Sequence, residues 1–192
     1  MLQGCDISHW NNINKVLKDE QDFVIFKATE GVKYVDKKML SNYQAYTGLP
    51  FIYPSTKLYG FYHYARPEKN QPVEEADLFL KTIAPHIGNC IMALDVEGVA
   101  LNYIPWAKMW LDYVYKKTGI KPLIYIQGSA TNTIQTIKDS GYGLWVAHYT
   151  KELKKPHIGV YPFYALWQYT SKPYDRDFFN GNEEQFKKYC RG

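Results

Sequence analysis

The chain has 192 residues, of which 46% are hydrophobic and 22% charged, and its net charge at pH 7 is +4. This length fits a single domain spanning residues 1–192 with a real hydrophobic core, and no apolar run approaches the roughly 18 residues that a membrane helix needs. The scattered lysines are less dense than the basic surface of a nucleic-acid-binding protein, so we expect neither nucleic acid binding nor membrane insertion.

The N-terminal residues and the cysteines indicate in which cell compartment the chain is made. Residues 1–4 lead directly into an apolar segment, without the basic stretch and apolar block of a signal peptide. Cys5, Cys90 and Cys190 are odd in number and widely spaced, which predicts neither a disulfide framework nor a zinc site. We therefore expect synthesis in the cytosol and no metal or other cofactor.

Apolar segments rich in Val, Ile, Leu, Tyr and Phe recur along the chain and predict strands. Most of them alternate poorly between polar and apolar residues, which is typical of parallel strands that are covered on both faces. The predicted strands are Leu2–Ile7, Phe23–Ala28, Tyr59–Tyr64, Ile91–Val96, Leu123–Gln127, Leu144–Ala147, Ala165–Tyr169 and a short one near Tyr174–Phe178.

Helical patterns separate the first strands. The predicted helices are Asn12–Glu20, Asp36–Thr47, Val73–Ile83, Tyr103–Thr118 and Ala130–Asp139, with a last one near Glu183–Tyr189. After Gly141, strands follow one another with little helix. Alternating strands and helices predict an α/β fold with a parallel sheet, here a modified TIM-like barrel of about five β-α units and three further strands, (β/α)5(β)3. An open doubly wound sheet is the alternative.

Polar or aromatic side chains stand at the carboxyl end of nearly every predicted strand, the end that forms the active-site face of such barrels. The segments concerned are Asp6–Trp10, Lys27–Gly31, Tyr62–Pro67, Asp95–Glu97, Tyr125–Gln127, Trp145–Tyr149, Trp167–Tyr169 and Asp175–Asp177. Because 17% of all residues are aromatic and aromatic faces stack on sugar rings, this pattern predicts an acidic, ring-lined cleft for a neutral polar substrate such as a glycan.

Two of these carboxylates, Asp95 and Glu97, follow an apolar segment and are separated by one valine. Residues two apart on a strand point to the same face, so these side chains should lie side by side. Two close carboxylates do not ionise together easily, and one of them tends to keep its proton. A proton donor beside an anion is what glycoside cleavage requires. A strand that simply ends in a polar loop is the alternative.

Seven segments, in this order, resemble the glycoside hydrolase family 25 muramidases, the lysozymes of the Chalaropsis type. They are Gly4–Ser8, Phe23–Gly31, Gly60–Tyr64, Leu94–Glu97, Leu144–Ala147, Leu166–Tyr169 and Asp175–Gly181. The resemblance spans nearly the whole chain. It implies a flattened barrel, in one catalytic domain, that hydrolyses the β-1,4 bond between N-acetylmuramic acid and N-acetylglucosamine in peptidoglycan.

By motif position, the resemblance implies a role for four carboxylates. Glu97 would be the general acid and Asp95 would stabilise positive charge near the reacting centre. Asp6 would be a third cleft carboxylate and Asp175 the fourth, a place that Asp177 could also fill.

We expect further side chains to contact the glycan, with core packing or a structural role as the alternative for the rings and histidines. The predicted substrate-binding residues are Tyr62, His63, Tyr64, Gln127, Trp145, His148, Trp167, Gln168 and Asp177. Lys27 and Arg66 could pair with cleft carboxylates and hold them ionised.

Two mechanisms remain open for the reaction. Asp95 could orient the substrate's own N-acetyl group to attack the anomeric carbon, which gives retention and is the mechanism we favour. Alternatively, Asp6 or Asp175 could activate water or attack directly. A glycan-binding barrel without catalysis and a chitinase-like hydrolase are the alternative functions.

Two expectations concern departures from the family pattern, one for a segment of the chain and one for its domain content. Residues Leu49–Lys57 look like an insertion before the third predicted strand, at the rim opposite the active-site face. We expect no separate wall-binding module in residues 1–192, whereas the resemblance implies that most cell-lysing relatives have one. We expect a monomer that acts on bacterial peptidoglycan strands at the cell wall, either as a phage lysin released at lysis or outside the cell.

Overall fold

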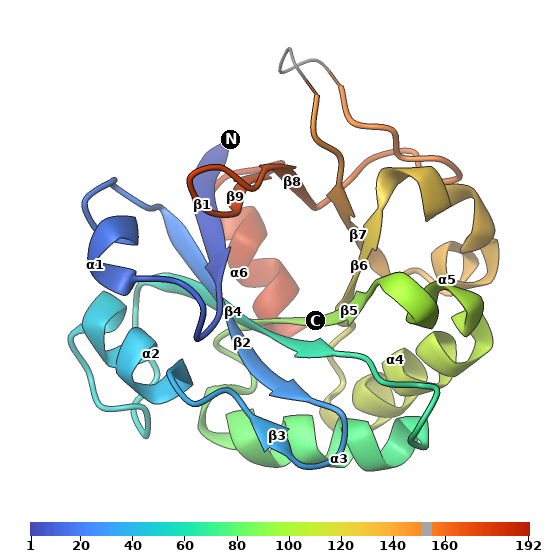
Figure 1. The fold of residues 1–192 in the computed structure, drawn as a ribbon, viewed down its shortest axis with the longest axis horizontal. Helices are drawn as coiled ribbons and strands as arrows, with labels where there is room; N and C mark the ends of the chain where they lie inside the picture. The colour runs from blue at the N-terminus through green and yellow to red at the C-terminus, as the bar shows by residue number, and fades with distance from the viewer. Residues whose placement is uncertain (151–154) are drawn as a thin grey trace.

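The computed structural model describes residues 1–150 and 155–192, in which nine strands form one sheet. Eight of them follow the order β1-β9-β8-β7-β6-β5-β4-β2, and β1 pairs with β2 as well, so the sheet closes into a barrel (Figure 1). This closure confirms the predicted barrel and excludes an open sheet. The strands are β1 (Leu2–Ile7), β2 (Phe23–Glu30), β3 (Tyr34–Val35), β4 (Leu58–Tyr64), β5 (Ile91–Val96), β6 (Leu123–Gln127), β7 (Gly143–Ala147), β8 (Leu166–Thr170) and β9 (Arg176–Phe179).

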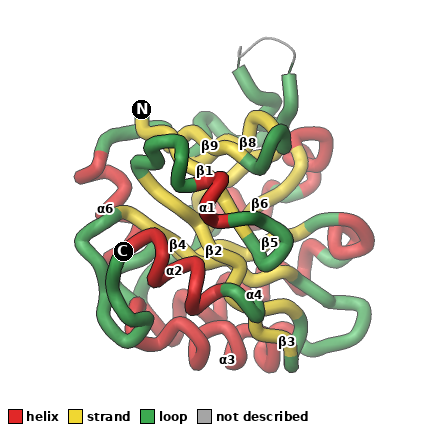
Figure 2. Tube along the Cα trace, turned by 60° about the vertical axis from the view of Figure 1, so that its left-hand side comes forward, coloured by secondary structure: helices red, strands yellow, loops and turns green. Residues whose placement is uncertain are grey.

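The barrel is mixed at one seam. Strands β1, β2, β4, β5, β6, β7 and β8 run parallel to their neighbours in this series, whereas β9 is antiparallel to both β1 and β8. The two-residue strand β3 lies outside the ring, antiparallel to the end of β2, and both views place it near α3 (Figures 1 and 2). The sequence pattern did not predict β3, because two residues carry no periodicity.

The helices surround the barrel, and two of them are shorter than predicted. They are α1 (Ile13–Val16), α2 (Met39–Thr47), α3 (Pro72–Ile83), α4 (Ile104–Thr118), α5 (Gln135–Asp139) and α6 (Glu183–Arg191), with 3-10 turns at Ala84–His86, Gly98–Asn102 and Gly128–Thr133. The predicted helices Asn12–Glu20 and Ala130–Asp139 are present only as α1 and α5. None of the helices among the described residues is long and apolar enough to cross a membrane.

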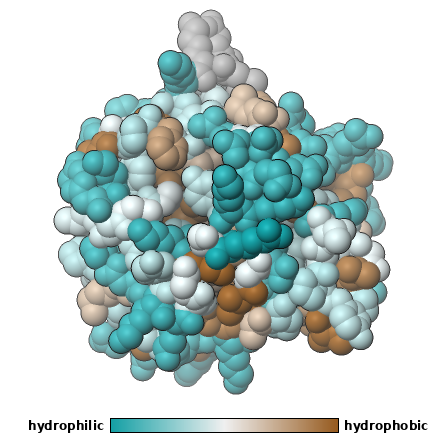
Figure 3. Space-filling model, turned by 180° about the vertical axis from the view of Figure 1, so that it is seen from behind, coloured by the Kyte–Doolittle hydropathy of each residue, from teal (hydrophilic) through white to brown (hydrophobic). Residues whose placement is uncertain are grey.

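The pleat of each strand divides the core into two layers. Residues such as Phe23, Ile91 and Trp145 point into the barrel, while their neighbours along the strands pack against the outer helices. Helix α6 closes the end of the barrel that lies behind the ring of strands in Figure 1, where Phe186 contacts Phe23 and Phe179 at centroid distances of 5.4 and 5.1 Å. From behind, the surface is mostly hydrophilic, with small hydrophobic patches (Figure 3).

A glycine allows β1 to close the barrel. Gly4 pairs with Phe23 of β2 on one side and with Asp177 of β9 on the other. A Cβ atom at Gly4 would come within 2.4 Å of the Phe23 carbonyl oxygen and 2.7 Å of its ring. No larger residue fits this position without displacing the seam.

We therefore expect Gly4→Ala to lower the free energy of unfolding by about 2 kcal/mol or more, since the added methyl group meets backbone rather than a flexible side chain. Urea denaturation followed by circular dichroism measures this change. Gln3→Ala, an exposed position on the same strand, is the matched control and should change stability by about 0.5 kcal/mol or less. Equal urea midpoints for Gly4→Ala and the wild type would show that the seam tolerates a side chain.

Candidate active site

The pleat alternation brings a set of carboxylates to one end of the barrel. Asp6 shares the inner face of β1 with Gly4, and Asp95 shares that of β5 with Ile91 and Ala93. Glu97 follows two residues after Asp95, just beyond the strand. Asp6 and Asp95 are each 6% exposed, whereas Glu97 is half-buried and therefore more open to solvent.

A cavity of about 350 Å³ lies over these carboxylates. Its lining includes eight of the predicted site residues, namely Asp6, Tyr62, Tyr64, Asp95, Glu97, Trp145, Gln168 and Asp175. It also includes Ser8, Trp10, Lys27, Tyr125 and Tyr149, of which Lys27 was expected to pair with a carboxylate. The strand ends thus form one acidic cleft walled by aromatic rings, as the sequence pattern predicts.

A hydrogen-bond network fixes Asp6 within this cleft. The Gln168 amide Nε2 donates to Asp6 Oδ2 at 2.7 Å. The hydroxyl groups of Tyr125 and Tyr149 both donate to Gln168 Oε1, at 2.8 and 2.6 Å. Because both hydroxyl donors need the oxygen, the amide of Gln168 has one favourable orientation and presents its nitrogen to Asp6.

Asp177 lies beneath the cleft rather than in it. It is fully buried on the inner face of β9, and its Oδ1 accepts a hydrogen bond from Trp145 Nε1 at 2.8 Å. Burial raises the pKa of Asp177 to about 7, although hydrogen bonds with Asp6 and Trp145 act in the opposite direction. Asp177 therefore supports Asp6 and Trp145 from below and does not reach the cleft, which corrects its prediction as a substrate contact.

Burial and mutual repulsion raise the pKa of each carboxyl group deep in the cleft. The pKa of Asp95 is well above its ordinary value, first because it is buried and then because of the charge of Glu97. The pKa of Asp6 is raised by burial and by the charges of Asp177 and Asp175. Burial and Glu97 raise the pKa of Asp175 to about 6. The site therefore retains protons at pH values where exposed carboxyl groups have lost them.

The structure places His63 and Trp167 on the outer face of the barrel, away from the cleft, because each stands one residue out of phase with its inward-pointing neighbours. Trp167 is 4% exposed, and its Nε1 donates to the carbonyl oxygen of His148 at 2.8 Å. These positions correct the prediction that both contact the glycan.

His63 belongs to a buried network between β4 and α3. Its Nε2 lies 2.6 Å from Glu75 Oε2, its Nδ1 lies 2.7 Å from Thr29 Oγ1, and its ring stacks on Trp110 at 5.6 Å. Glu75 also accepts a hydrogen bond from the backbone N–H of Arg66 at 3.1 Å. This network therefore holds the loop after β4 in place from inside the fold.

A second cavity of about 810 Å³ continues the cleft on one side and shares Glu97, Tyr125 and Tyr149 with it. Gln127 and His148, both predicted as substrate-binding residues, line this second cavity together with Gly128, Ser129, Ala147 and His157. The combined groove is longer than a single sugar ring requires. Trp10, Tyr125 and Tyr149 line the groove but were not predicted as binding residues, although each lies in or beside a strand-end segment.

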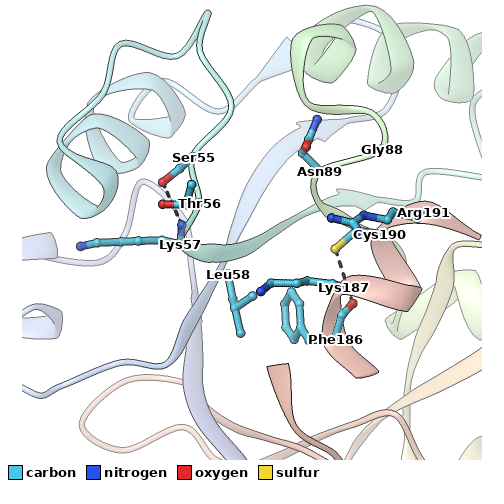
Figure 4. Close-up of a pocket in the computed structure, with 10 residues that line it drawn as sticks. All are labelled: Ser55, Thr56, Lys57, Leu58, Gly88, Asn89, Phe186, Lys187, Cys190 and Arg191. Atoms are coloured by element: carbon cyan, nitrogen blue, oxygen red, sulfur yellow. Dashed lines mark hydrogen bonds between the residues drawn. The ribbon is translucent and has the colours of Figure 1, made fainter. Parts of the chain in front are cut away.

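The Leu49–Lys57 segment lies at the opposite end of the barrel, as predicted. Phe51 packs against Tyr43 and His86 at centroid distances of 5.4 and 4.3 Å, and Lys57 Nζ donates to the carbonyl oxygen of Tyr46 at 2.6 Å. Residues 55–58 line a separate pocket of about 250 Å³ with Gly88, Asn89 and α6 (Figure 4). This segment therefore closes the base of the fold and does not reach the cleft.

No group of three or more His, Cys, Asp or Glu side chains within residues 1–150 and 155–192 is arranged to hold a metal ion. The acid–base groups that line the cleft are its carboxyl groups and their hydrogen-bond partners. Those groups offer a proton donor and several anions within one partly dry site.

Comparison with known proteins agrees with this arrangement. The chain is 30% identical to the uncharacterized protein YegX of Escherichia coli O157:H7, over 100% of this chain and 74% of the relative. It is 26% identical to the N,O-diacetylmuramidase of Chalaropsis sp over 100% of both chains. A family GH25 lysozyme structure from Aspergillus fumigatus superimposes with a TM-score of 0.80 at 27% identity, covering 100% of this chain and 99% of that one. The model of "Glycosyl hydrolases family 25" matches residues 5–178, and the chain is a glycoside hydrolase that belongs to this family.

Proposed function

We propose that the chain is an N-acetylmuramidase that cleaves the β-1,4 bond between N-acetylmuramic acid and N-acetylglucosamine in bacterial peptidoglycan. The observation that carries this proposal is the placement of Asp95 and Glu97 on one face, at the floor of an aromatic groove. The similarity to a Chalaropsis muramidase and to a fungal lysozyme supports this choice of bond. The proposed setting of this activity is the bacterial cell wall.

Glu97 is the proposed general acid. It is the more exposed member of the pair and lines both the central cavity and its extension, so a glycan lying along the groove crosses it. Its carboxyl proton passes to the glycosidic oxygen as the bond from that oxygen to the anomeric carbon breaks. The N-acetylglucosamine side then leaves as an alcohol.

Asp95 is the proposed partner of the reacting sugar. The carbonyl oxygen of the muramoyl N-acetyl group attacks the anomeric carbon, and Asp95 accepts a hydrogen bond from the N–H of that group. Water then adds to the anomeric carbon and returns a proton to Glu97, while the bond between that carbon and the N-acetyl oxygen breaks. The N-acetyl group is thereby restored on the sugar, and the product retains its configuration. The half-buried Tyr64 offers its ring to the sugars, whereas Tyr62 and Trp145 are 8% and 2% exposed and form the wall behind it. Above its pKa of about 6, Asp175 adds negative charge near the developing cation, and Asp6 lies beside it.

Replacing the proposed acid tests the assignment directly. We expect Glu97→Gln to lower kcat/KM on purified peptidoglycan by about 10³-fold, because the amide has no proton to donate, while binding to the wall is retained. Mass spectrometry of borohydride-reduced products identifies the cleaved bond by its reduced N-acetylmuramic acid ends. Glu183→Gln, at an exposed position on α6, is the matched control. Products that end in reduced N-acetylglucosamine would contradict the bond assignment.

The pH profile tests the contribution of Asp175. Because burial and Glu97 raise its pKa to about 6, Asp175 carries its charge above about pH 6 and loses it below. We expect kcat/KM to fall as the pH decreases through this value, and Asp175→Asn to lower activity at pH 7 and to remove that limb. The measurement is kcat/KM of the wild type and of Asp175→Asn from about pH 4.5 to about pH 8. Asp139→Asn on α5 should keep the wild-type profile, and an unchanged acid limb in Asp175→Asn would assign it to another group.

The stereochemistry of the product tests the role of Asp95. Attack by the N-acetyl group predicts that the first-formed product is the β-anomer, which proton NMR detects before mutarotation. Asp95→Asn should lower kcat by about 10²-fold with a smaller change in KM, since the N-acetyl group is positioned mainly in the transition state. A first-formed α-anomer would show inversion and exclude this mechanism.

A further inference from the structure

A third cavity, of about 740 Å³, adjoins the catalytic cleft on the side away from the second cavity, and shares Trp10 and Lys27 with the cleft. We call it the cationic extension. It is lined by His9, Trp10, Lys27, Glu30, Val32, Lys33, Tyr34, Lys37, Arg66, Lys69 and Asn70. These residues come from the segment after β1, from the end of β2 and the β2–β3 connection, from β3 and the residues after it, and from the loop after β4.

The lining of the cationic extension carries five positively charged side chains and one carboxylate, Glu30. Glu30 pairs with Lys27 at 2.6 Å and with Arg66 at 2.5 Å, which engages these two cations. Lys33, Lys37 and Lys69 are exposed and form no ion pair within the described part of the chain. The exposed carboxylate of Glu68 lies beside Lys69 in sequence but does not line the cavity. Three ammonium groups therefore remain available to an anionic ligand.

The floor of the cationic extension is held in place by its own contacts. Lys27 Nζ and the Arg66 guanidinium each lie 4.7 Å from the centre of the Tyr64 ring. The ring of Trp10 is 84% exposed and lies 4.5 Å from that of His9, which in turn contacts buried Asp36 at 2.8 Å. The site therefore combines an ordered aromatic and charged floor with three lysines at its rim.

The charges along the groove change sign where the cleft meets this cavity. Within residues 1–150 and 155–192, the central cleft holds four carboxyl groups, on Asp6, Asp95, Glu97 and Asp175, against one cation, Lys27, which is already paired with Glu30, so it disfavours an anionic group. Among the residues that the structure describes, those lining the second cavity include no lysine or arginine. Among the described residues of the groove, the cationic extension is therefore where the carboxylates of a glycan substituent meet the most positive charge.

We propose that the cationic extension binds carboxylate groups of the peptide stem that is attached to the muramoyl sugar, while the sugar chain lies over the acidic cleft. This inference rests on the proposed function, because it concerns the same substrate. Muramic acid carries its peptide through a lactyl ether, and the stem ends in free carboxylates that lysine ammonium groups bind as point charges. The substrate class is then the peptide-bearing strand rather than the bare glycan.

Equilibrium binding tests this proposal separately from catalysis. The probes are a muramoyl tetrasaccharide that carries its peptide stems and the same tetrasaccharide after enzymatic removal of the peptides, both titrated calorimetrically into Glu97→Gln protein. We expect the peptide-bearing probe to bind more tightly. Adding Lys33→Gln, Lys37→Gln and Lys69→Gln should raise its Kd by about fivefold and leave the Kd of the peptide-free probe unchanged.

The matched control is the triple variant Lys81→Gln, Lys116→Gln and Lys117→Gln, which removes the same charge from exposed positions on α3 and α4 that line none of the three groove cavities. It should bind both probes as the parent does. Because exposed charges are screened, salt near 1 M should abolish the preference for the peptide-bearing probe.

Three outcomes would overturn the inference. The first is an equal Kd for the two tetrasaccharide probes, and the second is an equal loss of affinity for both in the Lys33, Lys37 and Lys69 variant. The third uses soluble polyglycerol phosphate as an additional probe. If the variant loses affinity for this polymer alone, the site binds phosphate polymers. Cleavage of peptidoglycan by the wild type is measured in parallel. Selective binding without cleavage would reject the proposed muramidase activity and leave the binding site intact.

Discussion

The closure of the barrel by β1 is the constraint on which the site depends. This strand is the one element that pairs in parallel with β2 and antiparallel with β9, and Gly4 makes the close approach possible. Closure places Asp6 beside Asp177 of β9 and Asp175 just before it, and across the barrel from β5. Residues that lie far apart in the sequence thus share one enclosed volume, where each charge affects the others more strongly than it would in water.

Bringing these carboxyl groups together costs stability. In the unfolded chain each Asp has an ordinary pKa near 3.9, whereas in the fold Asp175 and Asp177 have values of about 6 and 7. Between those limits the folded protein binds more protons than the unfolded chain, so the contribution of these groups to stability falls as the pH rises from about 4 to about 7. Hydrogen bonds from Gln168 to Asp6 and from Trp145 to Asp177 offset part of this cost.

Most of the barrel could be predicted from the sequence, because its strands are continuous apolar segments that end in polar groups. The eight predicted strands match the observed ones to within two residues at either end, but α1 is one turn where a longer helix was expected. Hydrophobic periodicity predicts too long a helix when the apolar spacing continues past the residue at which the helix ends. Here the spacing continues beyond Val16, where α1 ends. The antiparallel direction of β9 follows from the short connection after β8, and no residue pattern within β9 indicates it.

The site was predicted in outline, and the errors at His63 and Trp167 have one cause. Reading the strand ends as blocks did not separate the inner from the outer face, so His63 and Trp167 were grouped with Tyr62 and Gln168. Alternation within each strand separates the two pairs, because side chains two residues apart on a strand point to the same face. Tyr62 in β4 and Gln168 in β8 therefore point inward, and the residues next to them point outward. The depth of Asp177 and the cationic extension could not be predicted, because both depend on how separate segments pack.

The buried network around His63 links the groove to distant packing. Glu75 holds the backbone of Arg66, and His63 joins that carboxylate to Trp110 on α4. The loop that carries Arg66 and Lys69 is therefore positioned by a ring on the far side of the barrel wall. The binding proposed for the cationic extension therefore depends on packing in the core, and substitutions in helix α4 that contact no sugar are expected to alter it.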